Sequence, residues 1–290
     1  MKEPIFTGVC TALVTPFLDG RINYPMLEVL IRRQIASGVK AIVLAGTTGE
    51  SPTLTDDEKL ELFRIGKTVS GKNALIIAGT GSNDTSHTMA MSIAAQEAGA
   101  DALLVVTPYY NKANAEGLFA HYLAVAHAVN IPVIIYNVPS RTGVDIPISV
   151  CARLSRIPNV GGIKEASTDI TRITALRNAC GTEFCIWSGN DAMILPVMAS
   201  GGIGVISVAS NVAPAELVDL CKAVLDGDLD TAISLQETLS PLFDLLSCDI
   251  NPMPVKAAMR AIGYDCGSCR LPLTGLAPSA QDRIQTYFSK

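Results

Sequence analysis

Short apolar runs rich in β-branched residues recur along the chain and alternate with longer stretches of mixed polarity. Runs such as residues 41–45 and 132–136 are apolar on both of the faces that a strand would present. Strands of this kind are typical of parallel sheets that helices cover on both sides. The pattern predicts strands near residues 8–14, 39–45, 74–79, 101–107, 132–137, 160–165, 183–188 and 203–208.

The stretches between these runs have the hydrophobic period of amphipathic helices. Thr55-Asp-Asp-Glu58 is a capping box at the start of one of them, and glycines follow several helix ends, at positions 38, 71, 99 and 181. The pattern predicts helices near residues 24–37, 55–70, 84–98, 114–128, 146–155, 169–180, 191–199 and 212–226.

Eight strand–helix units in about 225 residues match the count and length of a (β/α)8 TIM barrel. A doubly wound open sheet is the alternative, but the even spacing and the lack of a dinucleotide fingerprint after the first strand favour closure. Residues 227–290 change character: helical patterns near 227–247, 254–262 and 277–288 follow one another with no strand run between them. We therefore expect a barrel catalytic domain over residues 1–226 and a C-terminal helical region over 227–290.

Composition narrows the functional classes. Of 290 residues, 49% are hydrophobic and 17% charged, which suits a large core and excludes disorder. A net charge of −5 with no basic run makes nucleic acid an unsuitable partner. No apolar run has the length of a signal peptide or a membrane span, so we expect a cytoplasmic protein without membrane contact.

Cysteine and histidine usage gives no metal signature. The eight cysteines are scattered, and we expect reduced, mostly buried thiols. Cys266 and Cys269 form one C-x-x-C, but a second pair is missing, so coincidence is the better interpretation. The three histidines have no ligand spacing, and no metal site is expected.

The carboxyl ends of barrel strands carry the active site, so the residues at those ends matter most. Lys164 lies in the strand predicted near 160–165, where strict alternation would place Val160, Gly162 and Lys164 on one face. Gly161 and Gly162 would remove bulk beside it. Burial disfavours an ammonium, and the neutral amine is the form that attacks carbonyl carbon in Schiff-base chemistry. The alternative is an ordinary ion pair of Lys164 with Glu165 or another acid.

Other strand ends add compatible groups. Gly46-Thr-Thr-Gly-Glu50 offers two hydroxyls on a tight turn that could hold a small carboxylate, although a plain turn explains it equally well. Tyr136 would reach the barrel mouth as a proton carrier. Arg141 could clamp a carboxylate, or form a surface salt bridge instead. Residues 200–204 precede the last strand and are interpreted as a turn on the opposite face. Together these groups favour imine catalysis on a small carbonyl acid.

The chain also resembles the 4-hydroxy-tetrahydrodipicolinate synthases (dihydrodipicolinate synthases), within the superfamily of pyruvate-imine lyases and aldolases that includes N-acetylneuraminate lyase. The resemblance spans nearly the whole chain. The residues that carry it form eight stretches: Gly8 to Phe17, Gly46 to Ser51, Pro108 to Asn111, Tyr136 to Gly143, Gly162 to Ala166, Gly189 to Asp191, Gly204 to Ser207 and Asn251 to Lys256. Arg141 favours the synthases over the sialic acid lyases.

The resemblance implies a catalytic set and two substrates. Lys164 would form the Schiff base with pyruvate, Tyr136 would relay protons, and Thr47 would link Tyr136 to Tyr110 of a neighbouring subunit. The substrate-binding set would be Thr48, Arg141, Ile206 (through its backbone) and Gly189. Arg141 would hold L-aspartate 4-semialdehyde.

The resemblance further implies no metal or organic cofactor and a homotetramer built as a dimer of dimers. A related pyruvate-dependent aldolase or lyase, such as N-acetylneuraminate lyase or a 2-keto sugar-acid aldolase, is the alternative function. A ligand sensor that has lost the chemistry is a third.

A regulatory lysine pocket, as implied by the resemblance, is degenerate here. Ser51, Asn83 and Tyr109 match the pocket, but His87 stands where lysine-inhibited relatives have an acid. Asp56 and Lys59 stand where those relatives have histidines. Losing the acid that pairs with the amine of the ligand predicts weak or absent lysine feedback.

Overall fold

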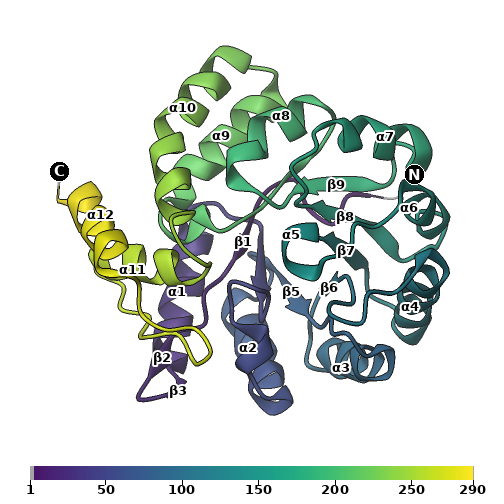
Figure 1. Cartoon of the computed structure of the whole chain (residues 1–290), viewed down its shortest axis with the longest axis horizontal. Helices are drawn as coiled ribbons and strands as arrows, with labels where there is room; N and C mark the ends of the chain where they lie inside the picture. The colour runs from purple at the N-terminus through teal and green to yellow at the C-terminus, as the bar shows by residue number, and fades with distance from the viewer. Residues whose placement is uncertain (1–2, 290) are drawn as a thin grey trace.

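Eight parallel strands close into a barrel in the computed structural model, which describes residues 3–289 (Figure 1). Each strand pairs with the next along the chain, and the last pairs with the first. The predicted TIM barrel is thus confirmed and the open sheet is wrong. The barrel strands are β1 (Gly8–Ala12), β4 (Ala41–Leu44), β5 (Leu75–Gly79), β6 (Ala102–Val106), β7 (Val133–Asn137), β8 (Val160–Glu165), β9 (Cys185–Ser188) and β10 (Gly204–Ser207).

Helices follow the strands and form the outer layer (Figure 1). The helix predicted near residues 55–70 starts and ends as its sequence indicates. Thr55 and Glu58 form the predicted capping box, and Gly71 ends the helix with a positive φ. The helices around the barrel are α1 (Tyr24–Ala36), α2 (Asp56–Ser70), α3 (Thr85–Glu97), α4 (Ala115–Ala128), α6 (Ile148–Leu154), α7 (Thr171–Cys180), α8 (Ile194–Ala199) and α9 (Pro214–Asp226). The single-turn α5 (Pro139–Thr142), which follows β7, lies inside this ring (Figure 1). Three short 3-10 helices, η1 (Ser51–Thr53), η2 (Asp191–Met193) and η3 (Ala209–Asn211), lie in loops that follow strands.

Strand residues divide between two cores. One core fills the space between sheet and helices, and a smaller one fills the barrel interior. In β7, Val133 and Ile135 belong to the outer core, whereas Ile134 and Tyr136 belong to the inner one. This division explains why the strands read as apolar on both faces.

The first half of β8 departs from the predicted alternation. Its pairing with β7 shifts register between Val133 and Ile134, which face Val160 and Gly162, so Gly161 is an extra residue. A bulge of this kind interrupts the two-residue period. Val160 consequently packs in the outer core with Ile163, and the expectation that it shares a face with Lys164 is wrong.

The C-terminal helices are α10 (Leu229–Leu246), α11 (Met253–Ala261) and α12 (Pro278–Phe288), and α10 lies against α9 (Figure 1). The segment after α11 reaches a hairpin of β2 (Phe17–Leu18) and β3 (Arg21–Ile22), which the sequence analysis did not predict. The Phe17 N–H donates to the Cys266 carbonyl at 2.9 Å. The division into two domains at residue 226 stays a prediction.

All eight cysteines are free thiols, and most are buried, as expected. Residues 200–203 form a turn before β10, and Gly201 there has a φ of +103°, which agrees with the predicted turn. Within residues 3–289, no helix is both long and apolar enough to cross a bilayer.

His121 is a buried group that should make the fold acid-sensitive. It lies on α4 with Nδ1 at 2.9 Å from Thr85 Oγ1, and burial lowers its pKa from 6.5 to about 4. Below pH 6.5 the unfolded chain binds a proton that the folded chain does not, so stability falls with pH until about 4. This group should cost about 2 kcal/mol of unfolding free energy at pH 5.

A His121→Gln variant should remove that component of the pH dependence, measured by urea unfolding between pH 7 and pH 4.5. His127→Gln, at an exposed position of the same helix, is the control and should keep the wild-type slope. If the free energy of unfolding falls equally with pH in all three proteins, His121 is not the group responsible.

Candidate active site

Lys164 lies near the carboxyl end of β8 and points into the barrel. It pairs in register with Tyr136 on β7 and with Trp187 on β9, whose side chains belong to the inner core. Its residue is only 5% exposed, and Nζ lies 4.3 Å from the centre of the Tyr136 ring. The predicted neighbours Lys164 and Tyr136 are therefore brought together.

Glu165 faces the opposite side of the sheet. Its carboxylate accepts hydrogen bonds from Asn137 Nδ2 at 2.9 Å and 3.1 Å and from Arg172 Nε at 3.2 Å. Because consecutive strand residues point to opposite faces, Glu165 cannot also meet the Lys164 ammonium inside the barrel. The alternative in which Lys164 pairs with Glu165 is wrong.

Space beside the lysine comes from Gly189 rather than from Gly161 or Gly162. A Cβ on Gly162 would lie 2.1 Å from the Cys185 carbonyl oxygen, so that glycine serves the close approach of two strands. A Cβ on Gly189 would lie 3.0 Å from Lys164 Cε and 2.6 Å from the Ala166 Cβ. The expected role of the two β8 glycines is corrected accordingly.

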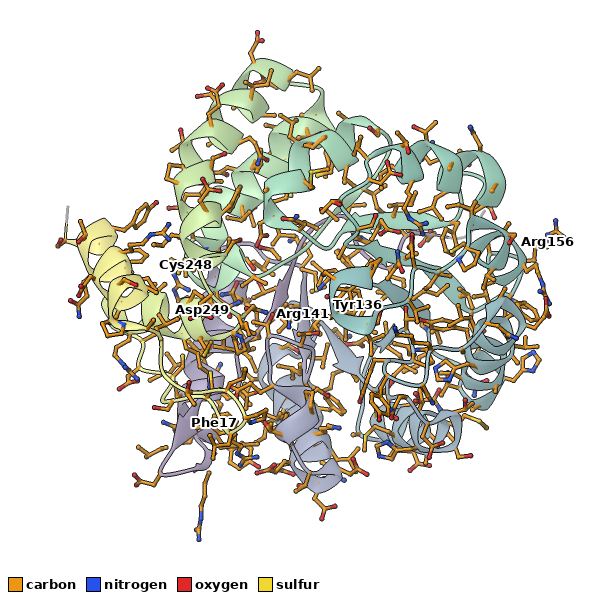
Figure 2. All side chains as sticks on the ribbon, in the orientation of Figure 1. Phe17, Tyr136, Arg141, Arg156, Cys248 and Asp249 are labelled. Carbon is orange, nitrogen blue, oxygen red and sulfur yellow. The ribbon has the colours of Figure 1, made fainter. Side chains whose placement is uncertain are left out.

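A cavity of about 660 Å³ opens at this end of the barrel. Lys164 and Tyr136 line it together with four other predicted site residues, Thr47, Thr48, Arg141 and Gly189. Arg141 is carried by α5, and Figure 2 shows it next to Tyr136 near the middle of the barrel. The cavity thus combines an amine, a phenol, two hydroxyls and an exposed guanidinium, the set needed to bind and activate a keto acid.

Asn251 is a cavity residue to which the sequence analysis assigned no role. Its side-chain amide donates to Thr48 Oγ1 at 2.9 Å, and Arg141 Nη2 lies 3.5 Å from its carbonyl oxygen. It lies between α10 and α11, so the C-terminal region lines the site. The family stretch from Asn251 to Lys256 marked this residue, but its contacts lie more than a hundred positions away in the sequence, so no spacing indicated its place in the cavity.

Asp191 is a second cavity residue that received no role. Its Oδ2 accepts hydrogen bonds from the N–H groups of Val208 and Ala209, at 3.0 Å and 2.9 Å. Removal from water raises the pKa of its carboxyl, although the hydrogen bonds that it accepts act in the opposite direction. Its position just after β9, within Gly189-Asn-Asp191, was the available signal.

Two predicted site residues lie outside the cavity of their own chain. The Ile206 side chain is fully buried in the inner core on β10. Tyr110 has a φ of +70° and is 89% exposed. A single chain therefore does not bring Tyr110 to Lys164, and its contribution from a second copy stays a prediction.

A second cavity of about 490 Å³ contains the predicted regulatory residues Ser51, Asn83, His87 and Tyr109. His87 Nε2 lies 2.9 Å from Asp56 Oδ2, and Lys59 Nζ lies 3.8 Å from Asp56 Oδ1. Burial lowers the pKa of Lys59 below its usual value. Thr47, Tyr136 and Arg141 line both cavities, so the two are adjacent.

Comparison with known proteins agrees with this arrangement. Residues 5–290 match the Dihydrodipicolinate synthetase family. A curated relative from Fervidobacterium nodosum, named 4-hydroxy-tetrahydrodipicolinate synthase, is 45% identical over 99% of this chain and 98% of its own.

Two solved structures are also similar. The 4-hydroxy-tetrahydrodipicolinate synthase from Methylacidiphilum fumariolicum SolV superposes with a TM-score of 0.96 at 41% identity, over 98% of this chain and 95% of that one. The chloride-inhibited dihydrodipicolinate synthase from Acinetobacter baumannii complexed with pyruvate has a TM-score of 0.95 at 40% identity, over 98% of both chains. Sequence, fold and cavity agree, and the chain belongs to the dihydrodipicolinate synthetase family.

Proposed function

We propose that this chain catalyses the 4-hydroxy-tetrahydrodipicolinate synthase reaction, in which pyruvate condenses with L-aspartate 4-semialdehyde in lysine (diaminopimelate) biosynthesis. The observation that carries the proposal is the inward-facing amine of Lys164, held near the Tyr136 ring in a cavity with Arg141 at its edge. The pyruvate complex of the Acinetobacter baumannii relative supports the choice of first substrate.

The reaction begins at the Lys164 nitrogen. The neutral amine adds to C2 of pyruvate, and loss of water from the carbinolamine leaves an imine. Tyr136, whose ring centre lies 4.3 Å from Nζ, carries protons during this dehydration. The Thr48 hydroxyl and the backbone at Ile206 hold the pyruvate carboxylate, and Gly189 leaves the room that the imine needs.

The second half of the reaction joins the two substrates. Loss of a proton from C3 turns the imine into an enamine, whose C3 attacks the aldehyde carbon and leaves a hydroxyl there. The amino group of the semialdehyde then attacks C2, the Lys164 nitrogen leaves, and the ring closes. Arg141 binds the carboxylate of the second substrate, for which a planar guanidinium offers two parallel hydrogen bonds.

The proposed assembly is a cytoplasmic homotetramer built from two tight dimers. Tyr110 is 89% exposed and lies outside the cavity of its own chain, which suits a side chain that enters a neighbouring subunit. There it would continue a proton path through Thr47 to Tyr136. The position of Thr47 in the lining of both cavities supports this path.

A substrate panel with pyruvate held constant tests the function. With pyruvate, we expect condensation with L-aspartate 4-semialdehyde. We expect no cleavage of N-acetylneuraminate or of 2-keto sugar acids. Turnover of a sugar acid in place of the semialdehyde would assign the chain to the aldolase or lyase alternative. Pyruvate binding without any turnover would indicate a sensor.

Lysine should bind weakly to the second cavity. The acid present there, Asp56, already contacts His87 and Lys59, so the amine of a bound lysine would compete for it. Calorimetry should show no saturation at micromolar lysine. A His87→Glu variant should bind lysine more tightly by about 1.5–3 kcal/mol, the contribution of a charged hydrogen bond. Micromolar affinity in the unmodified protein would contradict this prediction.

A further inference from the structure

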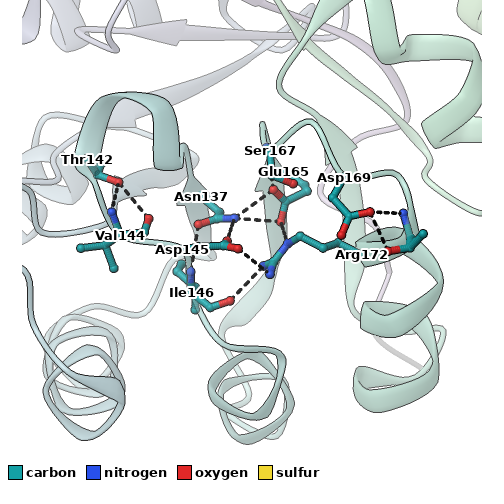
Figure 3. Close-up of polar contacts among 10 residues, drawn as sticks. Asn137, Thr142, Val144, Asp145, Ile146, Glu165, Ser167, Asp169 and Arg172 are labelled. Carbon is teal, nitrogen blue, oxygen red and sulfur yellow. Dashed lines mark hydrogen bonds and ion pairs between the residues drawn. The ribbon is translucent and has the colours of Figure 1, made fainter.

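A largely buried polar network joins the ends of β7 and β8 on the helix side of the sheet, and Figure 3 shows its contacts. In the β7–β8 register, Tyr136 pairs with Lys164 and the next residues, Asn137 and Glu165, pair with each other. Tyr136 and Lys164 point into the barrel, so Asn137 and Glu165 point toward the helices. Asn137 is fully buried and Glu165 is 3% exposed.

Asn137 connects the carboxyl ends of β7 and β8 to the loop between β7 and α6, which contains α5 and Arg141. Its Nδ2 donates to both Glu165 oxygens, at 2.9 Å and 3.1 Å, and to Asp145 Oδ1 at 2.7 Å. Its Oδ1 accepts from the Ile146 N–H at 3.1 Å. The amide group therefore fixes the end of β8 and the far end of the loop at the same time.

Arg172, on α7, connects the same two places from the other side. Its Nε donates to Glu165 Oε2 at 3.2 Å, its Nη1 to Asp145 Oδ2 at 3.1 Å, and its Nη2 to the Ile146 carbonyl at 2.9 Å (Figure 3). Its side chain is 11% exposed. One guanidinium thus holds two carboxylates and a backbone group in a fixed geometry.

We propose that Asn137, Asp145, Glu165 and Arg172 are positioning residues for the proposed reaction, and this inference rests on that proposed function. The Glu165 arm holds β7 against β8 and so sets Tyr136 relative to Lys164. The hydrogen bonds to Asp145, which we call the loop arm, hold the end of the segment between β7 and α6. That segment carries Arg141, so the loop arm sets the position of the guanidinium that binds the second substrate.

The physical reason is that imine chemistry depends on sub-ångström placement. A displacement of about 1 Å between reacting groups costs about a hundredfold in rate. Side chains in a satisfied buried network have few alternative geometries, which keeps the elements that they join in one arrangement. Arg141 itself is exposed, and within residues 3–289 its guanidinium makes one long hydrogen bond, to the Asn251 carbonyl at 3.5 Å, so its placement depends on its backbone.

Loss of the Asp145 contacts and loss of the Glu165 contacts should change different kinetic constants. Variants of Asp145 test the first set of contacts alone. Asp145 has a half-exposed side chain, so its replacement should leave the fold intact. Asp145→Ala should raise KM for aspartate semialdehyde about tenfold and leave KM for pyruvate and the rate of borohydride trapping within about twofold. Asp145→Asn keeps an oxygen for Asn137 and should show a smaller rise.

A matched control is Glu116, a carboxylate on the outer helices that also accepts two hydrogen bonds, both of them from Arg153, at 2.6 Å and 3.1 Å. Glu116→Ala should leave every kinetic constant unchanged. If Asp145→Ala behaves like Glu116→Ala, or changes the KM values of both substrates equally, the loop arm of the proposal is overturned.

Asn137→Ala tests the other arm. We expect the rate at which borohydride traps pyruvate on Lys164 to fall about tenfold or more, because the strand ends are no longer tied. Fluorescence of Trp187, the single tryptophan, reports whether the variant is folded. If that variant unfolds, Glu165→Gln replaces it, because it removes the charge and one of the two oxygens that accept from Asn137 and Arg172, and trapping should then fall by a smaller factor. Wild-type trapping in a folded variant overturns this arm, and trapping decides it even if the semialdehyde proves not to be the second substrate.

Discussion

Lys164→Ala should abolish the borohydride-trapped pyruvate adduct and lower kcat/KM by about 10⁴-fold or more, the scale seen when a catalytic nucleophile is removed. The methyl group of alanine leaves the cavity and its binding groups in place but supplies no nitrogen. Catalysis therefore has no covalent intermediate to pass through. Mass spectrometry of the digested protein, with and without pyruvate, locates the adduct.

The competing candidate for this role is Lys256, the other lysine within residues 3–289 that is deeply buried. Its Nζ lies 2.6 Å from Glu50 Oε1, and Lys256 does not line the cavity that contains Lys164. A Lys72→Ala variant, altered at an exposed position before β5, is the control and should keep the full adduct yield. An adduct that persists in Lys164→Ala, or maps to Lys256, would sink the proposed mechanism.

The barrel could be predicted because its signals are local. Apolar runs such as residues 132–136 report burial on both strand faces, and Thr55 with Glu58 marks a helix start within four residues. The bulge at Gly161 could not be predicted, because the two-residue period assumes a regular register. The β2–β3 hairpin was missed because strands of two residues carry no period.

The part of the site that lies at the carboxyl ends of barrel strands could be predicted from the sequence. Thr47, Tyr136 and Lys164 each follow or end a barrel strand, and closure of the sheet brings such ends around one cavity. Asn251 reaches the cavity from a segment about two hundred residues beyond Thr48, and no spacing rule predicts that contact. The roles of these residues, and the entry of Tyr110 from a second copy, stay predictions.

The buried ion pair between Lys256 and Glu50 should be the most stability-sensitive contact that we test. The two side chains are 4% and 1% exposed. Glu50 ends the Thr47–Thr48 turn with a φ of +59°, and its Oε2 accepts from the Arg270 N–H at 2.9 Å. Lys256 Nζ also lies 4.3 Å from the centre of the Phe17 ring. The pair thus joins α11 to the turn that lines the active site.

Lys256→Met should lower the free energy of unfolding by about 3–5 kcal/mol, because it leaves the Glu50 carboxylate buried without its cation. Urea unfolding followed by Trp187 fluorescence measures this loss. The double variant Glu50→Gln/Lys256→Met should recover most of the stability, since no unpaired charge remains. Lys222→Met, which breaks the exposed Lys222–Asp226 pair on α9, should cost less than about 1 kcal/mol. If Lys256→Met and Lys222→Met lower the free energy of unfolding by the same small amount, the Lys256–Glu50 pair is hydrated in solution. It then cannot be what holds the turn in place.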